Sequence, residues 1–453
     1  MTSARLQAPF ARELSGMESF MAGMSVTMNA IIRGRGRGRL EEPLLRQALA
    51  LLREAHPALG GRVVRATGGA GFALRLDEPD LPVLRFVSAD PEQRPEDEEL
   101  LLREGEVLAV RVTTRGDRFR LVFSCHHSLA DGRAMLAHLR RLLSIYTSLA
   151  ATGKALAGPA RPVPLSPEKA LCERGVEKLD FEEFLRRGYG EQAVEFFNSA
   201  RRPPQTPGPA GPVAAAAPGE LTVARGRLRL SKEKTAALLR LGKRAQLTMH
   251  GLVSAAAVLA ELLLEGAPDF LVFQLRSVVD ARARVVPPIT EPTAVTNFAG
   301  SSTAVVLAER SGDPLDWAKQ VLSQIGADLE SGLVAQSILQ MSGSMDAVRE
   351  LAGAACAPAP DTVFITNVGV LPPFELPDSI VLEDLHGVIH SSPGPDAFAC
   401  KAGQGASRNR SYLVSTFNGR LNLDLFGFGA DEARAAPLLD ALERAFDTIL
   451  ARA

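Results

Sequence analysis

The chain has 453 residues, more than one domain usually holds, so two or three domains are expected. Hydrophobic residues make up 46% and charged residues 23%, which is typical of globular proteins. A net charge of −1 excludes a general attraction to nucleic acid or to an acidic membrane. The four cysteines form no CxxC pair, which favours reduced thiols in a cytoplasmic protein. We expect neither a signal peptide nor a transmembrane segment.

The first third of the chain has the mixed pattern of an α/β fold. Residues 24–32 form an extended apolar run, and leucines at helical spacing predict a helix over residues 41–55. Strands are predicted at residues 61–64, 72–76, 107–113 and 118–125. The triplet Arg115-Gly116-Asp117 lies between the last two strands, so we interpret it as a hairpin turn rather than an adhesion signal.

The tract GRGRGR at residues 34–39 invites comparison with phosphate loops and with Arg-Gly nucleic-acid tracts. It lacks the Lys-Ser or Lys-Thr of a phosphate loop, and one short tract in a neutral chain is a weak nucleic-acid signal. We therefore expect a surface loop between a strand and a helix, and no nucleic-acid partner.

The second half repeats the mixed pattern after a segment rich in Pro, Gly and Ala. Residues 201–219 have no apolar period, which predicts a linker between an N-terminal lobe (1–200) and a C-terminal lobe (220–453). Strands are predicted at residues 226–230, 270–276, 302–308 and 363–367, and helices at 231–243, 248–264, 314–329 and from 431 onward. The pair Asn418-Gly419 between two alternating runs predicts a tight hairpin.

The stretch FSCHHSLADGRAM at residues 123–135 carries the strongest chemical signal. The adjacent residues His126 and His127 end a predicted strand, and a helix with apolar residues at spacings of three and four follows from Met135. Asp131 stands where a carboxylate favours an N-cap, and Gly132 permits a sharp bend and a close approach. We expect the histidines on a tight strand-to-helix connection.

Several roles for the histidine pair can be compared. A shared metal is disfavoured because adjacent residues on an extended chain point to opposite faces, and His386 and His390 lie in a segment that is not typical of a helix. A cysteine nucleophile is disfavoured because Cys125 faces away from His126, and no Gly-x-Ser-x-Gly elbow is present. We expect no metal. A general base fits better, because a neutral imidazole accepts protons at cellular pH, but two structural imidazoles remain an alternative.

The segment HHSLADG resembles the His-His-x-x-x-Asp-Gly signature of the condensation-domain superfamily of acyltransferases. That superfamily includes peptide condensation domains, chloramphenicol acetyltransferase, polyketide-associated acyltransferases, wax ester synthases and the more distant BAHD enzymes. Further similar segments follow in the family's order: LEEPLLRQALALLREAHPALGGRV, QLTMHGLVSAAAVLAELL, VVDARARVVPP with TNFAG, and VFITNVGVL. They span most of the chain and most resemble stand-alone polyketide-associated or alcohol acyltransferases.

The resemblance implies an α/β fold of two chloramphenicol acetyltransferase-like lobes in a V, each a mixed sheet with helices, with the active site at their interface. It implies that His127 is the general base for an acceptor that attacks a thioester carbonyl. His126 would then be packed inward. Asp131 would be structural, held by Arg282 or, as second candidate, by Arg284 of the other lobe.

Two further positions are implied as candidates for binding substrate or the oxyanion. Thr366 and Asn367 lie in the segment that resembles the family's tunnel-lining strand. The segment DLFGFGAD at residues 424–431 is only superficially similar to the C-terminal BAHD motif, so we do not transfer that motif's role.

The expected function is transfer of an acyl group from acyl-CoA, or from a separate acyl carrier protein, to a lipid or natural-product hydroxyl, less often an amine. No cofactor is expected, because the coenzyme A or phosphopantetheinyl thioester is a substrate. We expect a cytoplasmic monomer. Two alternatives stay open: a condensation enzyme acting between carrier proteins, and a non-catalytic recruiting member of the fold.

Overall fold

The computed structural model describes residues 10–24, 29–66, 71–76, 83–91, 105–201, 223–341, 361–390, 409–428 and 435–452. The chain divides into two compact units, each assembled from three separate stretches. Unit 1 comprises Met1–Gly175, Val285–Phe298 and Leu371–Ala397. Unit 2 comprises Val176–Arg284, Ala299–Val370 and Phe398–Ala453.

The expected boundaries at 1–200, 201–219 and 220–453 stay a prediction, because residues 202–219 of the expected linker lie outside the described residues. The two units nevertheless exchange segments along the sequence. Val285–Phe298 and Leu371–Ala397 come from the second half of the chain but pack in unit 1. A single boundary along the sequence therefore cannot separate the two units.

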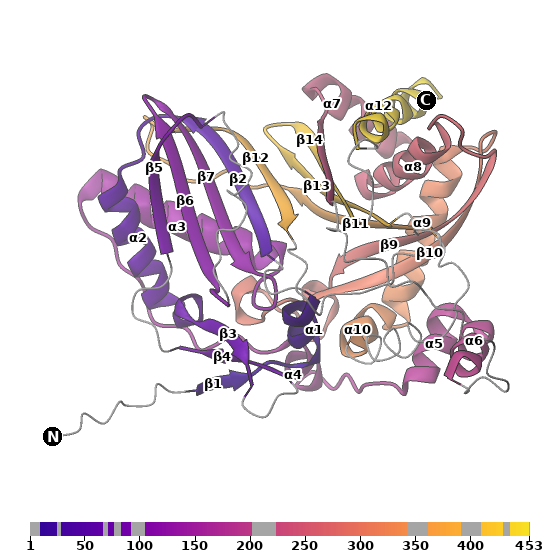
Figure 1. The fold of residues 1–453 in the computed structure, drawn as a ribbon, viewed down its shortest axis with the longest axis horizontal. Helices are drawn as coiled ribbons and strands as arrows, with labels where there is room; N and C mark the ends of the chain where they lie inside the picture. The colour runs from indigo at the N-terminus through magenta and orange to yellow at the C-terminus, as the bar shows by residue number, and fades with distance from the viewer. Residues whose placement is uncertain are drawn as a thin grey trace, which may run out of the picture. The chain divides into compact units, whose positions relative to one another are not determined.

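Unit 1 is built on a five-stranded sheet in the order β12-β2-β7-β6-β5 (Figure 1). Its strands are β2 (Asn29–Arg37), β5 (Val83–Ser88), β6 (Leu108–Arg115), β7 (Arg118–His126) and β12 (Val381–His390). Neighbouring strands are antiparallel except β5 and β6, which are parallel. The edge strand β12 comes from late in the sequence, so this sheet depends on a long-range pairing.

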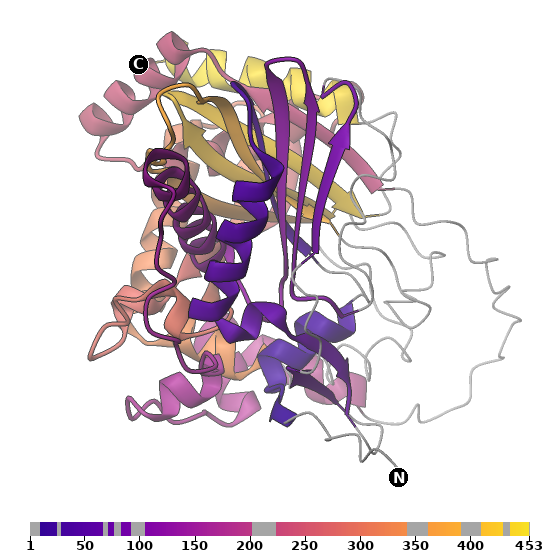
Figure 2. The same cartoon turned by 90° about the vertical axis from the view of Figure 1, so that its left-hand side faces the viewer.

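Two amphipathic helices, α2 (Glu42–Ala55) and α3 (Gly132–Thr152), pack against each other beside this sheet (Figures 1 and 2). Their apolar stripes are buried, as the spacing of three and four predicts. A smaller sheet has the order β1-β4-β3. The remaining elements of unit 1 are β1 (Phe10–Glu13), α1 (Gly16–Met24), η1 (Pro57–Gly60), β3 (Arg62–Arg65), β4 (Phe72–Arg75), α4 (Pro167–Cys172) and η4 (Pro292–Ala294).

The prediction of a surface loop at GRGRGR is wrong for most of the tract, because β2 continues to Arg37. The alternation of Gly and Arg has the two-residue period of a strand, so arginines and glycines lie on opposite faces. A Cβ at Gly36 would lie 2.2 Å from the Val381 carbonyl oxygen and 2.6 Å from the Phe119 ring. On the other face, Arg35 pairs with Asp384 at 3.4 Å. Glycine is thus required by close packing.

Unit 2 is built on a six-stranded sheet in the order β10-β9-β11-β13-β14-β8. Its strands are β8 (Val223–Arg229), β9 (Phe270–Asp280), β10 (Ala299–Glu309), β11 (Asp361–Val370), β13 (Asn409–Phe417) and β14 (Arg420–Phe428). β11 runs parallel to both of its neighbours, β9 and β13, and the other pairs are antiparallel. The sheet is therefore mixed, as expected for each lobe.

The helical layer of unit 2 is centred on α8 (Met249–Leu262), which is buried along nearly its whole length. This burial explains why its sequence is apolar all round. It packs against α9, α12 and strands β9 to β11 (Figure 1). The other helices are α5 (Phe181–Tyr189), α6 (Glu191–Arg201), α7 (Lys232–Ala245), η3 (Arg282–Arg284), α9 (Pro314–Glu330), α10 (Leu333–Leu339) and α12 (Ala435–Ala451).

Both predicted tight turns are confirmed. Asn418 and Gly419, with φ of 49° and 72°, join β13 to β14, which is the backbone that an Asn-Gly hairpin turn requires. Gly116, with φ of 62°, joins β6 to β7. The predicted start of the last helix at residue 431 lies outside the described residues, and α12 begins at Ala435.

No single helix in the described ranges is long and apolar enough to cross a membrane. Within the same ranges, α7 and α8 taken together have sufficient length and apolar composition, but the pair is bent by 107°.

The packing at Gly36 yields a stability prediction. Gly36→Ala should lower the free energy of unfolding by about 1–3 kcal/mol, because the added methyl group collides with strand backbone and an aromatic ring. Urea unfolding would measure the loss. Gly71→Ala is the matched control, since no heavy atom lies within 4 Å of a Cβ there. Equal unfolding midpoints for the two variants would contradict the proposed packing constraint.

Candidate active site

The histidine pair lies where β7 turns into α3, as the sequence predicts. β7 ends at His126, residues 127–129 form a turn, and α3 begins at Gly132. Oδ1 of Asp131 accepts hydrogen bonds from the backbone N–H groups of Arg133 at 3.1 Å and Ala134 at 3.0 Å. The predicted N-cap is therefore confirmed, and the chain reverses before Gly132 rather than at it.

His126 is directed into the core of unit 1. It is 2% exposed, and its Nδ1 accepts a hydrogen bond from the Ser128 backbone N–H at 3.3 Å. Burial lowers the pKa of His126 to about 4, with a smaller contribution from neighbouring His127. The imidazole is therefore neutral at cellular pH, and its acceptor nitrogen is already bonded within the protein.

His127 is only partly buried, and its Nδ1 lies 3.0 Å from the carbonyl oxygen of Ala130. A carbonyl oxygen only accepts hydrogen bonds, so this contact assigns the proton of the neutral ring to Nδ1 and leaves the lone pair on Nε2. Burial lowers the pKa of His127 below 6.5, opposed by the Ala130 carbonyl and then by the Asp131 carboxylate. The ring is thus neutral at cellular pH and can accept a proton at Nε2.

A segment from the second half of the sequence completes the surroundings of His127 within unit 1. The backbone N–H of Phe298 donates to Oδ2 of Asp131 at 2.9 Å. The side-chain Nδ2 of Asn297, which is 1% exposed, donates to the His127 carbonyl oxygen at 3.2 Å. Asn297 lies in the segment TNFAG, whose resemblance to the family gave no role to this side chain.

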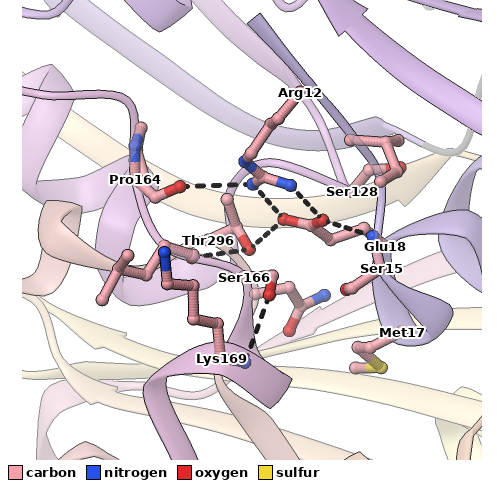
Figure 3. A network of polar contacts seen from close by, with 12 residues as sticks. Arg12, Ser15, Met17, Glu18, Ser128, Pro164, Ser166, Lys169 and Thr296 are labelled. Carbon is pink, nitrogen blue, oxygen red and sulfur yellow. Dashed lines mark hydrogen bonds and ion pairs between the residues drawn. The ribbon is translucent and has the colours of Figure 1, made fainter. Parts of the chain in front are cut away.

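The same segment is anchored by a buried carboxylate (Figure 3). Glu18 in α1 is 0% exposed and accepts two hydrogen bonds from the guanidinium of Arg12, at 2.6 and 2.5 Å. It also accepts from the Ser15 backbone N–H at 2.9 Å and from Oγ1 of Thr296 at 2.7 Å. Arg12 reaches the Pro164 carbonyl oxygen at 3.2 Å. A lone glutamate in a short helix gives no sequence signal of this role.

The described residues of unit 1 bear on two alternatives for the histidine pair, a cysteine nucleophile and a shared metal. Cys125 is fully buried, and burial raises the pKa of its thiol, so a thiolate nucleophile is disfavoured. His386 and His390 lie on β12, where a spacing of four residues corresponds to about 13 Å. Across the described ranges, no group of three or more His, Cys, Asp or Glu residues is arranged to hold a metal ion.

The predicted arginine partners of Asp131 belong to unit 2. Arg282 is 3% exposed, and its Nη1 lies 3.1 Å from Oδ1 of Asp280, also in unit 2. Arg284 is exposed at the end of the same short 3₁₀ helix. A pair between Asp131 and either arginine would join the two units, so it stays a prediction.

The candidate oxyanion residues also lie in unit 2, on β11. Thr366 is partly exposed. Oδ1 of Asn367 accepts a hydrogen bond from the Gly369 backbone N–H at 2.9 Å, beside an irregularity in the pairing of β11 with β13. Asn367 thus has a local structural role, and binding of an oxyanion by either residue stays a prediction. Residues 424–428 lie in β14, the second strand of a hairpin.

Comparisons with known proteins agree with this fold and this signature. Residues 219–426 match the family described as phthiocerol/phthiodiolone dimycocerosyl transferase C-terminus. The phthiocerol/phthiodiolone dimycocerosyl transferase of Mycobacterium leprae is 28% identical over 404 residues, which cover 87% of this chain and 90% of that protein. The structure of polyketide synthase associated protein 5 from Mycobacterium tuberculosis is 25% identical with a TM-score of 0.73, covering 98% and 99% of the two chains.

Two more distant structures support the fold alone. The first condensation domain of the calcium-dependent antibiotic synthetase is 15% identical with a TM-score of 0.64, covering 97% of this chain and 96% of the other. A trichothecene 15-O-acetyltransferase from Fusarium sporotrichioides is 14% identical with a TM-score of 0.65, covering 96% and 94%. Both cover nearly the whole of this chain, so the similarity includes both units.

The predicted class is confirmed by the mixed α/β units, the HHSLADG connection and these similarities. The chain belongs to the superfamily of condensation domains and chloramphenicol acetyltransferase-like enzymes. Within that superfamily it is an acyltransferase, close to the polyketide-associated members.

The buried carboxylate yields the second prediction. Glu18→Gln should lower the free energy of unfolding by about 3–5 kcal/mol, because the Arg12 guanidinium loses its charged partner and an amide N–H replaces an acceptor. Thermal and urea unfolding would measure the loss. Glu42→Gln is the control, because its pair with Arg46 is exposed and should contribute less than about 1 kcal/mol. A loss as small as in the control would refute the anchoring role.

Proposed function

We propose that this enzyme transfers an acyl group from a thioester to a hydroxyl group of a lipid or natural-product acceptor, with Nε2 of His127 as general base. The observation that carries the proposal is the contact between Nδ1 of His127 and the Ala130 carbonyl oxygen, which leaves the Nε2 lone pair available. The name of a relative, phthiocerol/phthiodiolone dimycocerosyl transferase, supports transfer to an alcohol oxygen rather than to nitrogen.

The proposed reaction has two steps and no acyl-enzyme. The acceptor hydroxyl gives its proton to Nε2 of His127 while its oxygen attacks the thioester carbonyl, forming a tetrahedral oxyanion. The oxyanion then collapses, the carbon–sulfur bond breaks, and the leaving thiolate takes the proton from the imidazolium. The ester and a free thiol are released, and the imidazole returns to its neutral form.

Supporting roles follow from the same proposal. Asp131 maintains the geometry of the turn that carries His127, and pairing with Arg282, or else with Arg284, would hold its carboxylate from unit 2. Thr366 or Asn367 would donate a hydrogen bond to the oxyanion. Removal of one such donor elsewhere costs about 2.7–4 kcal/mol of transition-state stabilisation.

The proposal also specifies the thioester donor. We propose acyl-CoA as the donor, with a separate acyl carrier protein as the alternative. The name of the similar structure, polyketide synthase associated protein 5, favours instead a donor held on a separate carrier. A condensation enzyme acting between two carriers would use the same histidine chemistry.

The third prediction concerns the base. His127→Ala should reduce turnover by about 10²–10⁴, the usual contribution of a general base. In the wild type, kcat/KM should fall as the pH drops through the lowered pKa of His127, below 6.5, because protonation removes the acceptor lone pair. Release of free thiol from an acyl-CoA with a long-chain alcohol would be followed. The control is His56→Gln, which replaces a histidine outside the turn and should retain activity. Full activity of His127→Ala would disprove the assignment of His127 as general base.

The fourth prediction concerns the order of events. Direct attack on the thioester requires both substrates to be bound together, so double-reciprocal plots should intersect rather than run parallel. Intact mass spectrometry after incubation with acyl-CoA alone should show the unmodified chain. A stable acyl-enzyme would contradict the mechanism. If turnover occurs only with a carrier-bound donor, the proposed attack on the thioester still holds, but the donor is a carrier protein rather than acyl-CoA.

A further inference from the structure

Three consecutive residues of unit 1 bind three different parts of the histidine site. Thr296 donates through Oγ1 to the buried Glu18 carboxylate, as described above. Asn297 donates through Nδ2 to the His127 carbonyl oxygen, and Phe298 donates through its backbone N–H to Asp131. Asn297 contacts the histidine itself.

The Asn297 amide also lies beside the imidazole. Its Nδ2 is 3.3 Å from Nδ1 of His127 as well as 3.2 Å from the His127 carbonyl oxygen. The orientation of the amide follows from the carbonyl contact, since an amide oxygen there would face another acceptor. Asn297 therefore presents an N–H group, not a lone pair, to this side of the ring.

The hydrogen bond from Asn297 to the His127 carbonyl oxygen affects which acceptor the imidazole Nδ1–H of His127 binds. Nδ1 of His127 lies 3.0 Å from the Ala130 carbonyl oxygen, and the backbone groups of Ala130 and of His127 itself both raise the pKa of His127. The hydrogen bond from Asn297 engages the His127 carbonyl, so Nδ1–H is directed to Ala130 at 3.0 Å. The ring is then held with Nε2 on the side away from these contacts.

We propose that Asn297 is a positioning residue for the general base. It binds the His127 backbone carbonyl, favours one orientation and one tautomer of the ring, and places no negative charge beside Nδ1. This inference rests on the proposed role of His127. It assigns to Asn297 two effects that a purely structural residue would lack: a fixed Nδ1–H tautomer, and a neutral group rather than a charged one beside Nδ1.

The isosteric variant Asn297→Asp tests the second effect. A carboxylate about 3.3 Å from Nδ1 would stabilise the imidazolium, so the pKa of His127 should rise by about one to two pH units. The acid limb of the pH profile of kcat/KM should move upward by the same amount. Thr296→Val is the matched control in the same segment, because it removes a hydrogen bond to Glu18 and leaves the amide beside the ring.

Nitrogen NMR of the histidine rings provides a readout that does not require activity. With His127→Gln used for assignment, the full-length wild-type chain should show a protonated Nδ1 and an unprotonated Nε2 in the neutral ring. Asn297→Ala should give a mixture of tautomers or of ring environments. This variant also serves if Asn297→Asp does not fold.

The outcomes separate the inference from the function on which it rests. A pKa rise in Asn297→Asp but not in Thr296→Val supports the positioning role, even if no substrate has been found. An Nε2–H tautomer in the wild type, an unchanged pKa in Asn297→Asp, or an equal shift in both variants overturns it. Full activity of His127→Ala, by contrast, would refute the general base and leave the measured tautomer as a structural fact.

Discussion

The geometry of the candidate site depends on the carboxylate of Asp131. One of its oxygens binds two backbone N–H groups at the start of α3, and the other binds the backbone N–H of Phe298. The first interaction fixes where the helix begins, and hence where the carbonyl of Ala130 points. Because that carbonyl binds Nδ1 of His127, the helix cap and the orientation of the His127 ring are parts of one arrangement.

Two adjacent imidazoles acquire different chemistry from their surroundings. Burial lowers the pKa of both, but His126 has its acceptor nitrogen bound by a backbone N–H inside the core. His127 donates from Nδ1 instead, so its lone pair remains at Nε2. The difference arises where β7 ends, because His126 is the last residue of the strand and His127 is the first residue of the turn that leads to α3. Histidine is thus packed in the core at position 126, whereas at position 127 it carries an acceptor lone pair on Nε2.

The features that could be predicted from the sequence are those determined by local interactions. The connection from strand through turn to helix, the Asp131 cap and the Asn418-Gly419 hairpin depend on residues within a few positions of one another. The prediction was wrong at GRGRGR, because Gly36 is required by close packing against Phe119 and Val381, and Val381 is more than 300 residues away in sequence. The roles of Glu18 and Asn297 were missed for the same reason, since each is defined by a partner on a remote segment.

The remote segment explains why the first half of the chain is insufficient to form the site. Val285–Phe298 packs in unit 1, yet the residues on both sides of it in the sequence belong to unit 2. Without this segment, the buried carboxylate of Glu18 would lose Thr296, the His127 carbonyl would lose Asn297, and Asp131 would lose the Phe298 N–H. Buried polar groups left without partners are costly, so the histidine turn and the remote segment should order together. The HHSLADG segment is contiguous in sequence, but the hydrogen-bonded surroundings of His127 are assembled from both halves of the chain.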